Sequence, residues 1–165
     1  MADQKNLKRA KTVFNTICIA LDNKDWKYEK NEDDLVITLL VSGDDLPMGI
    51  IIAVDADRQL IRLLSPIPSK FTDELSYLGA LACCHFTYKL ADGSFDYNLT
   101  EGTVVFRITS TFIDSLISEE LISYIIDTAC STIDEYNHHF EALAKGDMTL
   151  DELLQIDWFF KRMTH

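Results

Sequence analysis

The sequence contains few residues that break or cross-link a chain, and their scarcity excludes several protein classes. The six glycines and three prolines form no repeat, low-complexity tract or linker, so the 165 residues suit one domain. Four cysteines are far fewer than a disulfide scaffold needs. All four stand in apolar stretches that are predicted to be helical, where a free cysteine behaves as a small hydrophobic residue. We therefore expect a reducing, cytoplasmic location.

Long apolar runs are also absent. No uncharged segment approaches the roughly 18–20 residues that a membrane-spanning helix needs, so we expect no membrane insertion. The segments "KNLKRAK" and "VFNTICIAL" loosely imitate a secretory signal peptide. However, Asn15 and Thr16 interrupt the apolar stretch, and no small-residue cleavage site follows it, so we expect no leader peptide.

Basic residues are in the minority, because 15 lysines and arginines oppose 27 aspartates and glutamates. The formal net charge of −12 repels a phosphate backbone, and nucleic acid is therefore not an expected partner. The exception is the segment 1–11, in which four basic residues oppose only Asp3. We interpret this segment as the solvated face of a helix, with docking on an acidic surface, such as that of a second subunit, as the alternative.

Apolar residues at helical spacing predict four helices. Ser118 followed by two glutamates is typical of a helix start, because a hydroxyl caps the first N–H groups and the anions stand at the positive end of the helix dipole. Gly146 is expected to end that helix, and Thr149 with Glu152 has the spacing of a capping box. The predicted helices cover residues 4–23, 70–90, 119–145 and 149–162.

Stretches rich in β-branched residues predict five strands. Pro66 and Pro68 are expected to end the first group of strands, and "WKYEK" (26–30) is expected to be extended. The predicted strands cover residues 35–42, 48–55, 59–65, 94–99 and 103–112. The order α–β–β–β–α–β–β–α, followed by an extra C-terminal helix, predicts an α+β fold with an antiparallel sheet.

The run Cys83-Cys84-His85 combines residue types that bind metals or perform nucleophilic catalysis. In a helix, however, neighbouring side chains point about 100° apart, so these three cannot converge on one ion. Catalysis by a cysteine would also need a distant base and an exposed thiolate. We therefore interpret the run as part of the packing of its helix.

A second chemical candidate is "DEYNHHF" (134–140), in which Asp134 and His138, and Glu135 and His139, are spaced for contact on a helix. Each pair could hold a metal, but the two histidines point in different directions, and we interpret them as a solvated face. The chain has no glycine-rich nucleotide-binding loop and no nucleophile elbow. The prediction is accordingly a protein that is not an enzyme and has no cofactor and no metal.

The helix at 70–90 is apolar on nearly all sides. Tyr77, Leu81, Cys84 and Tyr88 share the face opposite to the one expected to pack on the sheet. A helix that is buried on both faces must touch a second surface, and we expect that surface to be another subunit. Replacement of Cys84 by serine is then expected to be destabilising, because the hydroxyl would be buried in apolar surroundings.

The C-terminal segment adds two further candidate contact residues. Trp158 and Phe159 fall outside the apolar stripe of the helix predicted there, so one contact surface cannot cover every apolar side chain. Aromatic side chains are frequent anchors where proteins meet. We expect the segment to pack on its own domain or on the dimer mate, with recruitment of a partner protein as the alternative.

The order of elements resembles that of the YbjN-like proteins, which share the fold of the type III secretion chaperones. The segments that carry the resemblance are "LADGSFDYNLTEGTVVFRITSTF" (90–112) and "ISEELISYIIDTACSTIDEYNHHFEALAKGD" (117–147). The resemblance indicates a domain at 1–147 with a C-terminal helical extension at 148–165. The family often has an asparagine near the end of the second helix, where this chain has Cys83-Cys84-His85. The departure removes no catalytic residue, because the family pattern supplies none.

The resemblance implies a cytoplasmic, dimeric and non-enzymatic bacterial protein that handles or regulates other proteins. Our first hypothesis is accordingly a homodimeric module that binds an unidentified protein partner, as a chaperone or a regulator. A metal-dependent enzyme or metal sensor that uses His138 and His139 is the second hypothesis. A small-ligand binder, with a pocket between the sheet and the long helix, is the third.

Overall fold

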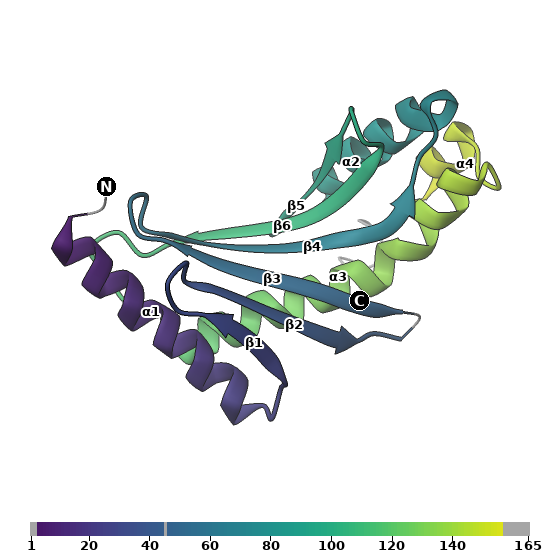
Figure 1. Ribbon diagram of the computed structural model, residues 1–165. Helices are drawn as coiled ribbons and strands as arrows, with labels where there is room; N and C mark the ends of the chain where they lie inside the picture. The colour runs from purple at the N-terminus through teal and green to yellow at the C-terminus, as the bar shows by residue number, and fades with distance from the viewer. Residues whose placement is uncertain (1–2, 45, 157–165) are drawn as a thin grey trace.

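The computed structural model describes residues 3–44 and 46–156, and within them it has an α+β fold with one antiparallel sheet. The six strands lie in the order β1-β2-β3-β4-β6-β5 (Figure 1). They are β1 (Tyr28–Asn31), β2 (Val36–Ser42), β3 (Pro47–Asp55), β4 (Leu60–Lys70), β5 (Ser94–Asn98) and β6 (Thr103–Thr111). The helices are α1 (Gln4–Asn23), α2 (Ser76–Lys89), α3 (Glu119–Lys145) and α4 (Leu150–Gln155).

The predicted fold class and most of the predicted elements are confirmed. The caps of α3 are those expected from the sequence: the Ser118 hydroxyl accepts a hydrogen bond from the Leu121 N–H, and Gly146 ends the helix in a left-handed conformation with φ of 76°. The capping box of Thr149 and Glu152 at the start of α4 is also present.

Four boundaries differ from the prediction. The stretch that was expected to be merely extended contains the short strand β1, and β4 continues through Pro66 and Pro68 to Lys70. The helix α2 begins at Ser76, after a 3-10 turn at Asp73–Leu75. The helix α4 ends at Gln155, and the rest of the predicted helix, from 157 onward, lies outside the described residues.

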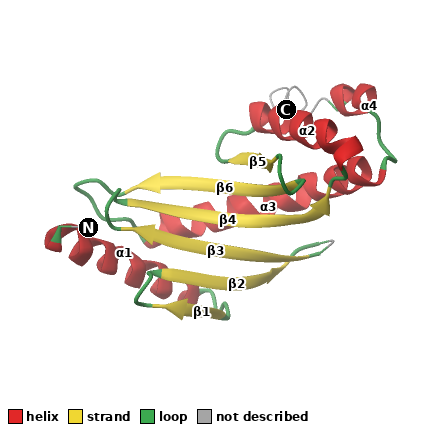
Figure 2. Ribbon diagram, turned by 45° about the horizontal axis from the view of Figure 1, so that its top comes forward, coloured by secondary structure: helices red, strands yellow, loops and turns green. Residues whose placement is uncertain are grey.

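The helices pack on one face of the sheet. Alternate residues of each central strand point to that face and are buried, as with Ile52 in β3, Leu63 in β4 and Phe106 in β6. The aromatic rings of Phe86 in α2 and Phe95 in β5 lie against Phe140 of α3, which joins α2, α3 and the sheet in one core. Figure 2 shows α3 running behind the full width of the sheet, with α1 near one end and α2 near the other.

The pairing of β3 with β4 stops halfway along both strands. The last paired residues are Ile51 and Leu64, whereas β4 stays paired with β6 as far as Lys70. Figure 1 shows the two strands separating beyond this point. We call this unpaired part of the β3–β4 boundary the split.

The prolines of the chain explain the split. The Phe112 N–H donates a hydrogen bond to the Gln59 carbonyl, so the main-chain groups of Gln59 face the β6 side. Successive residues of a strand direct these groups to alternate sides, and those of Pro66, seven positions further on, therefore face β3. If the pairing of Ile51 with Leu64 continued, Pro66 would oppose Gly49 and Pro68 would oppose Pro47. Proline has no N–H, so the ladder would lose donors on both strands, although Pro66 still pairs in register with β6.

Among the described residues, no helix has the length and apolar character required to cross a membrane.

Candidate partner-binding surfaces

The helix α2 presents apolar side chains to two sides. On its inner side Leu78, Ala82 and Phe86 are buried against the sheet and α3. On its outer side Tyr77 is 58% exposed, and Tyr88 is 89% exposed. Leu81 and Cys84 are exposed on the same side. The structure therefore puts all four predicted contact residues of α2 on one exposed stripe of the single chain, which we call the α2 stripe.

Cys83, Cys84 and His85, which the sequence analysis assigned to the packing of their helix, have three different environments. Cys83 is buried, and this burial raises the pKa of its thiol to about 12. Cys84 is exposed, so a large cost of Cys84→Ser requires a second subunit that covers it. His85 is half-buried, and burial lowers its pKa. The described residues contain no group of three side chains that could hold a metal ion.

The interpretation of the two histidines of α3 as a solvated face is right for His138 and wrong for His139. His138 is exposed, whereas His139 is only 7% exposed and its ring lies 5.8 Å from that of Phe86. Burial, together with the smaller effect of the neighbouring His138, lowers the pKa of His139 to about 4. The buried arc of α3 is wider than its apolar stripe because α2 covers an additional side of the helix.

The carboxylate of Asp134 has a structural role instead of pairing with His138. Its Oδ1 accepts a hydrogen bond from the Asp44 N–H at 3.1 Å. This bond ties the loop between β2 and β3 to α3. The same loop is closed by a hydrogen bond from the Gly43 N–H to the Leu46 carbonyl.

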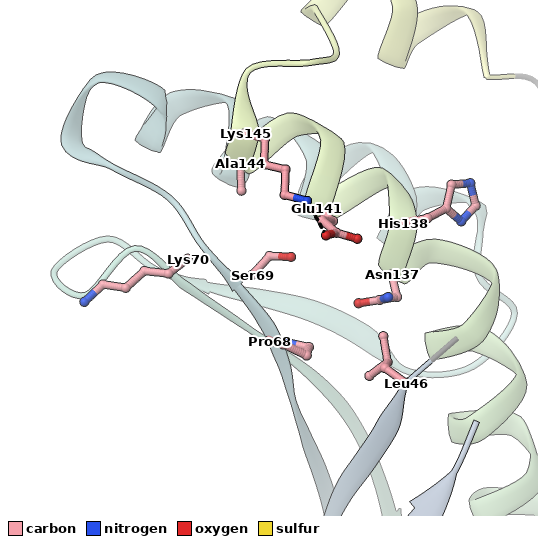
Figure 3. Close-up of a pocket in the computed structure, with 9 residues that line it drawn as sticks. All are labelled: Leu46, Pro68, Ser69, Lys70, Asn137, His138, Glu141, Ala144 and Lys145. Atoms are coloured by element: carbon pink, nitrogen blue, oxygen red, sulfur yellow. Dashed lines mark hydrogen bonds and ion pairs between the residues drawn. The ribbon is translucent and has the colours of Figure 1, made fainter. Parts of the chain in front are cut away.

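Beside this loop lies a groove of about 720 Å³, in the place between the sheet and the long helix where the third hypothesis put a pocket. It lies between the end of β4 and the C-terminal half of α3, next to the split, and Figure 3 shows its lining. We call it the β4–α3 groove. Its lining residues are Leu46, Pro68, Ser69, Lys70, Asn137, His138, Glu141, Ala144 and Lys145.

Asn137 is the unusual member of this lining. The residue as a whole is 4% exposed, its side-chain amide makes no hydrogen bond with any described residue, and the amide atoms are open to the groove. Figure 3 shows this amide directed into the groove, toward Pro68 and Ser69. Buried polar groups nearly always have a partner, so an unpartnered amide at the surface of a groove is a candidate contact for a bound molecule. Asn137 stands within "DEYNHHF", but the polar residues of this segment that were considered as candidates were its histidines and the carboxylates beside them.

The predicted contact residues Trp158 and Phe159 lie outside the described residues. The end of the described chain is held on α2, because the Lys89 ammonium donates a hydrogen bond to the Ile156 carbonyl. Leu153 of α4 is buried and belongs to the core.

Comparisons with known proteins identify the fold. No family model matches the chain, and no curated protein matches it. A chain in the crystal structure of the ExsC–ExsE complex matches with a TM-score of 0.56 and 12% identity, covering 81% of this chain and 93% of that one. A chain in the structure of the HopA1–SchA chaperone–effector complex matches with a TM-score of 0.54 and 12% identity, covering 86% and 98%.

The third similar structure is the crystal structure of YbjN from E. coli, with a TM-score of 0.55 and 10% identity over 76% of this chain and 92% of that one. At such low identity the likeness concerns the fold. The fold implied by the sequence resemblance is thereby confirmed: the chain has the YbjN-like, type III secretion chaperone-like fold.

Proposed function

We propose that the protein is a homodimeric module that binds another polypeptide, as a chaperone or a regulator, and that it is not an enzyme. The observation that carries the proposal is the α2 stripe. Its two tyrosines and its leucine are exposed in the single chain although the helix is firmly attached to the core by Leu78, Ala82 and Phe86. An apolar surface on a rigid element is typical of a contact with another protein.

The spacing within the α2 stripe supports a symmetric contact. Tyr77, Leu81, Cys84 and Tyr88 follow one another at alternating steps of four and three positions, which is the spacing of a helix–helix seam. Two copies of one such helix can pack around a two-fold axis, since the same patch then serves both subunits. The similar chains that come from complexes with a second protein support the polypeptide-binding part of the proposal.

The titratable groups with displaced pKa values support a non-catalytic role. Cys83 and His139 owe their shifts mainly to burial in the core, and neither opens on the β4–α3 groove. The four cysteines are free, which supports a reducing, cytoplasmic location.

The test of the dimer is a measurement of mass in solution by light scattering coupled to gel filtration. We expect twice the chain mass for the wild-type protein at micromolar concentration, and a monomer for the double variant Tyr77→Glu with Leu81→Glu, because two glutamates per subunit would be buried in the contact. Leu116→Glu alters an exposed leucine outside α2 and is the matched control, which should stay dimeric. A monomeric wild-type protein would refute this part of the proposal.

Polypeptide binding is tested by purification of the tagged protein from its host, followed by reconstitution of each recovered complex from purified components. We expect at least one defined stoichiometric complex. Recovery under several growth conditions without any complex that can be reconstituted would argue against the proposed function.

A further inference from the structure

We propose that the β4–α3 groove binds an extended segment of a polypeptide by its main chain, with the Asn137 side chain as the central hydrogen-bonding group. This inference rests on the proposed function and adds to it a second contact surface, separate from the α2 stripe. Four observations support it: the state of Asn137, the main-chain chemistry of the split, the charge of the lining, and the size of the groove.

Asn137 is buried in α3, and its amide lacks a hydrogen-bond partner among the described residues. A primary amide donates two hydrogen bonds and accepts two, so it can bind the N–H and the C=O of one peptide unit at the same time. Figure 3 shows the amide directed into the groove, where its donors and its acceptor are open to a bound molecule. A peptide main chain in the groove would pair with both kinds of group.

The split complements this amide. Pro66 turns its main chain toward the split and has no N–H to offer, and the next proline, Pro68, lines the groove itself. This stretch of β4 is therefore richer in carbonyl acceptors than in donors. The Ser65 hydroxyl donates a hydrogen bond to the Gly49 carbonyl across the split, with an oxygen–oxygen distance of 2.8 Å. A molecule that fits here must bring N–H donors, as a polypeptide main chain does.

The charges of the lining favour an uncharged main chain over an ionic ligand. The Lys145 ammonium is paired with the Glu141 carboxylate at 2.5 Å, so these two charges compensate each other. Lys70 extends away from the other lining side chains in Figure 3. An anionic ligand would thus meet no free cation directed into the groove from the lining, and the volume of about 720 Å³ leaves room for several residues of an extended chain.

The experiment begins with selection of peptides on the full-length protein from a phage-displayed library of random sequences. The affinity of the selected peptides is then measured by titration calorimetry for the wild-type protein, for Asn137→Leu and for the control Asn15→Leu. Leucine has nearly the shape of asparagine but makes no hydrogen bonds, and Asn15 is exposed on α1, far along the sequence from the groove. We expect binding to weaken about tenfold or more in Asn137→Leu and to remain unchanged in Asn15→Leu.

A second measurement separates loss of binding from loss of folding. Asn137→Leu keeps the size of the side chain and breaks no hydrogen bond within the described residues, so its melting temperature should stay close to that of the wild-type protein. In the wild-type protein itself, the side-chain NH2 signals of Asn137 in NMR spectra should shift when a selected peptide is added. This observation remains decisive even if the variant fails to fold.

Two outcomes would overturn the inference. Peptides that bind wild type and Asn137→Leu equally, but lose affinity for the variant Tyr77→Glu with Leu81→Glu, would assign peptide binding to the α2 stripe and leave the proposed function intact. Failure to select any peptide would exclude the groove as a general peptide site, while the dimer and the reconstituted complexes would still test the proposed function independently.

Discussion

Two polar residues of α3, Asn137 and His139, lie inside the protein for different reasons. His139 fills space against Phe86 in the contact between α3 and α2, and Asn137 lies where α3 meets the groove. The apolar stripe of the helix was predictable from its periodicity. The burial of its flanks was not, because it depends on how far α2 and β4 wrap around the helix, and no pattern within "DEYNHHF" encodes that.

The buried His139 predicts a loss of stability in mild acid. Its pKa is about 4 in the folded protein and about 6.5 in an unfolded chain, so the unfolded state takes up the proton first as the pH falls. Its contribution is therefore complete above about pH 6.5 and decreases toward pH 4, with a loss on the order of 1 kcal/mol between about pH 7.5 and 5.5. Urea denaturation at a series of pH values measures this loss.

The matched variants for this prediction are His139→Leu and His138→Gln. The first removes the buried imidazole and should flatten the dependence of the unfolding free energy on pH. The second alters the exposed neighbour, so the unfolding free energy should depend on pH as it does in the wild-type protein. Equal slopes in His139→Leu and in the wild-type protein would show that His139 does not cause the acid sensitivity.

At the scale of single elements, α2 was easy to predict as a helix, but the contacts of its outer face were not predictable. Its inner and outer apolar faces were predictable from the angles between residues. The roles of its two adjacent cysteines follow from the same angles, since Cys83 points inward and Cys84 outward. What covers the outer face depends on a second molecule, and the sequence of one chain specifies that contact only as an exposed apolar stripe.

The two cysteines of α2 directly test whether a second subunit packs on the outer face of this helix. A maleimide should modify Cys84 rapidly in dilute protein and more slowly as the concentration rises and subunits associate. Cys83 should stay unmodified throughout, because it is buried and its pKa is raised to about 12, which leaves almost no thiolate. Peptide mapping by mass spectrometry distinguishes the two sites. A dimer in which Cys84 reacts as fast as in the monomer would have its interface elsewhere.

The strand β4 shows why the prediction from its prolines was wrong. Proline was expected to end the strand, and in an interior strand with two paired edges it would. Here the main-chain groups of Pro66 face β3 only, so the loss of the N–H ends one ladder and leaves the other, with β6, intact. The direction of a main-chain group depends on strand register, which local sequence does not reveal.

Pro66→Val should extend the β3–β4 ladder by restoring an N–H opposite Gly49. The new hydrogen bond is worth about 0.5–1.5 kcal/mol, and the greater freedom of the unfolded chain offsets about 0.4–1 kcal/mol of it, so the net stability should change little. The informative measurement is hydrogen exchange, in which the Gly49 amide should become more protected. Pro47→Val serves as the comparison on the opposite strand. Unchanged exchange at Gly49 in both variants would mean that the prolines do not cause the split.

At the scale of the whole molecule, the layered α+β architecture was predictable because each element carries its own signal: alternation in the strands, amphipathic spacing in α1 and α3, and explicit caps at both ends of α3. A pocket between the sheet and the long helix was one of the alternatives, but the residues that line the β4–α3 groove were not predictable. The groove forms from the loop at Leu46, the end of β4 and residues 137–145 of α3, which are distant in sequence and meet only in the folded chain.

The arrangement of the prolines also affects the tendency of the protein to aggregate at high concentration through exposed main-chain groups. An unpaired strand edge is a template for other strands and a common origin of aggregation. The two ends of the sheet are short strands, and β1 carries the charged residues Glu29 and Lys30. Within the sheet, Pro66 and Pro68 leave carbonyls without the alternating N–H groups that an incoming strand requires. The split therefore offers acceptors for N–H donors but cannot continue a full β-ladder, so it is a poor template for the indiscriminate addition of strands that leads to fibrils.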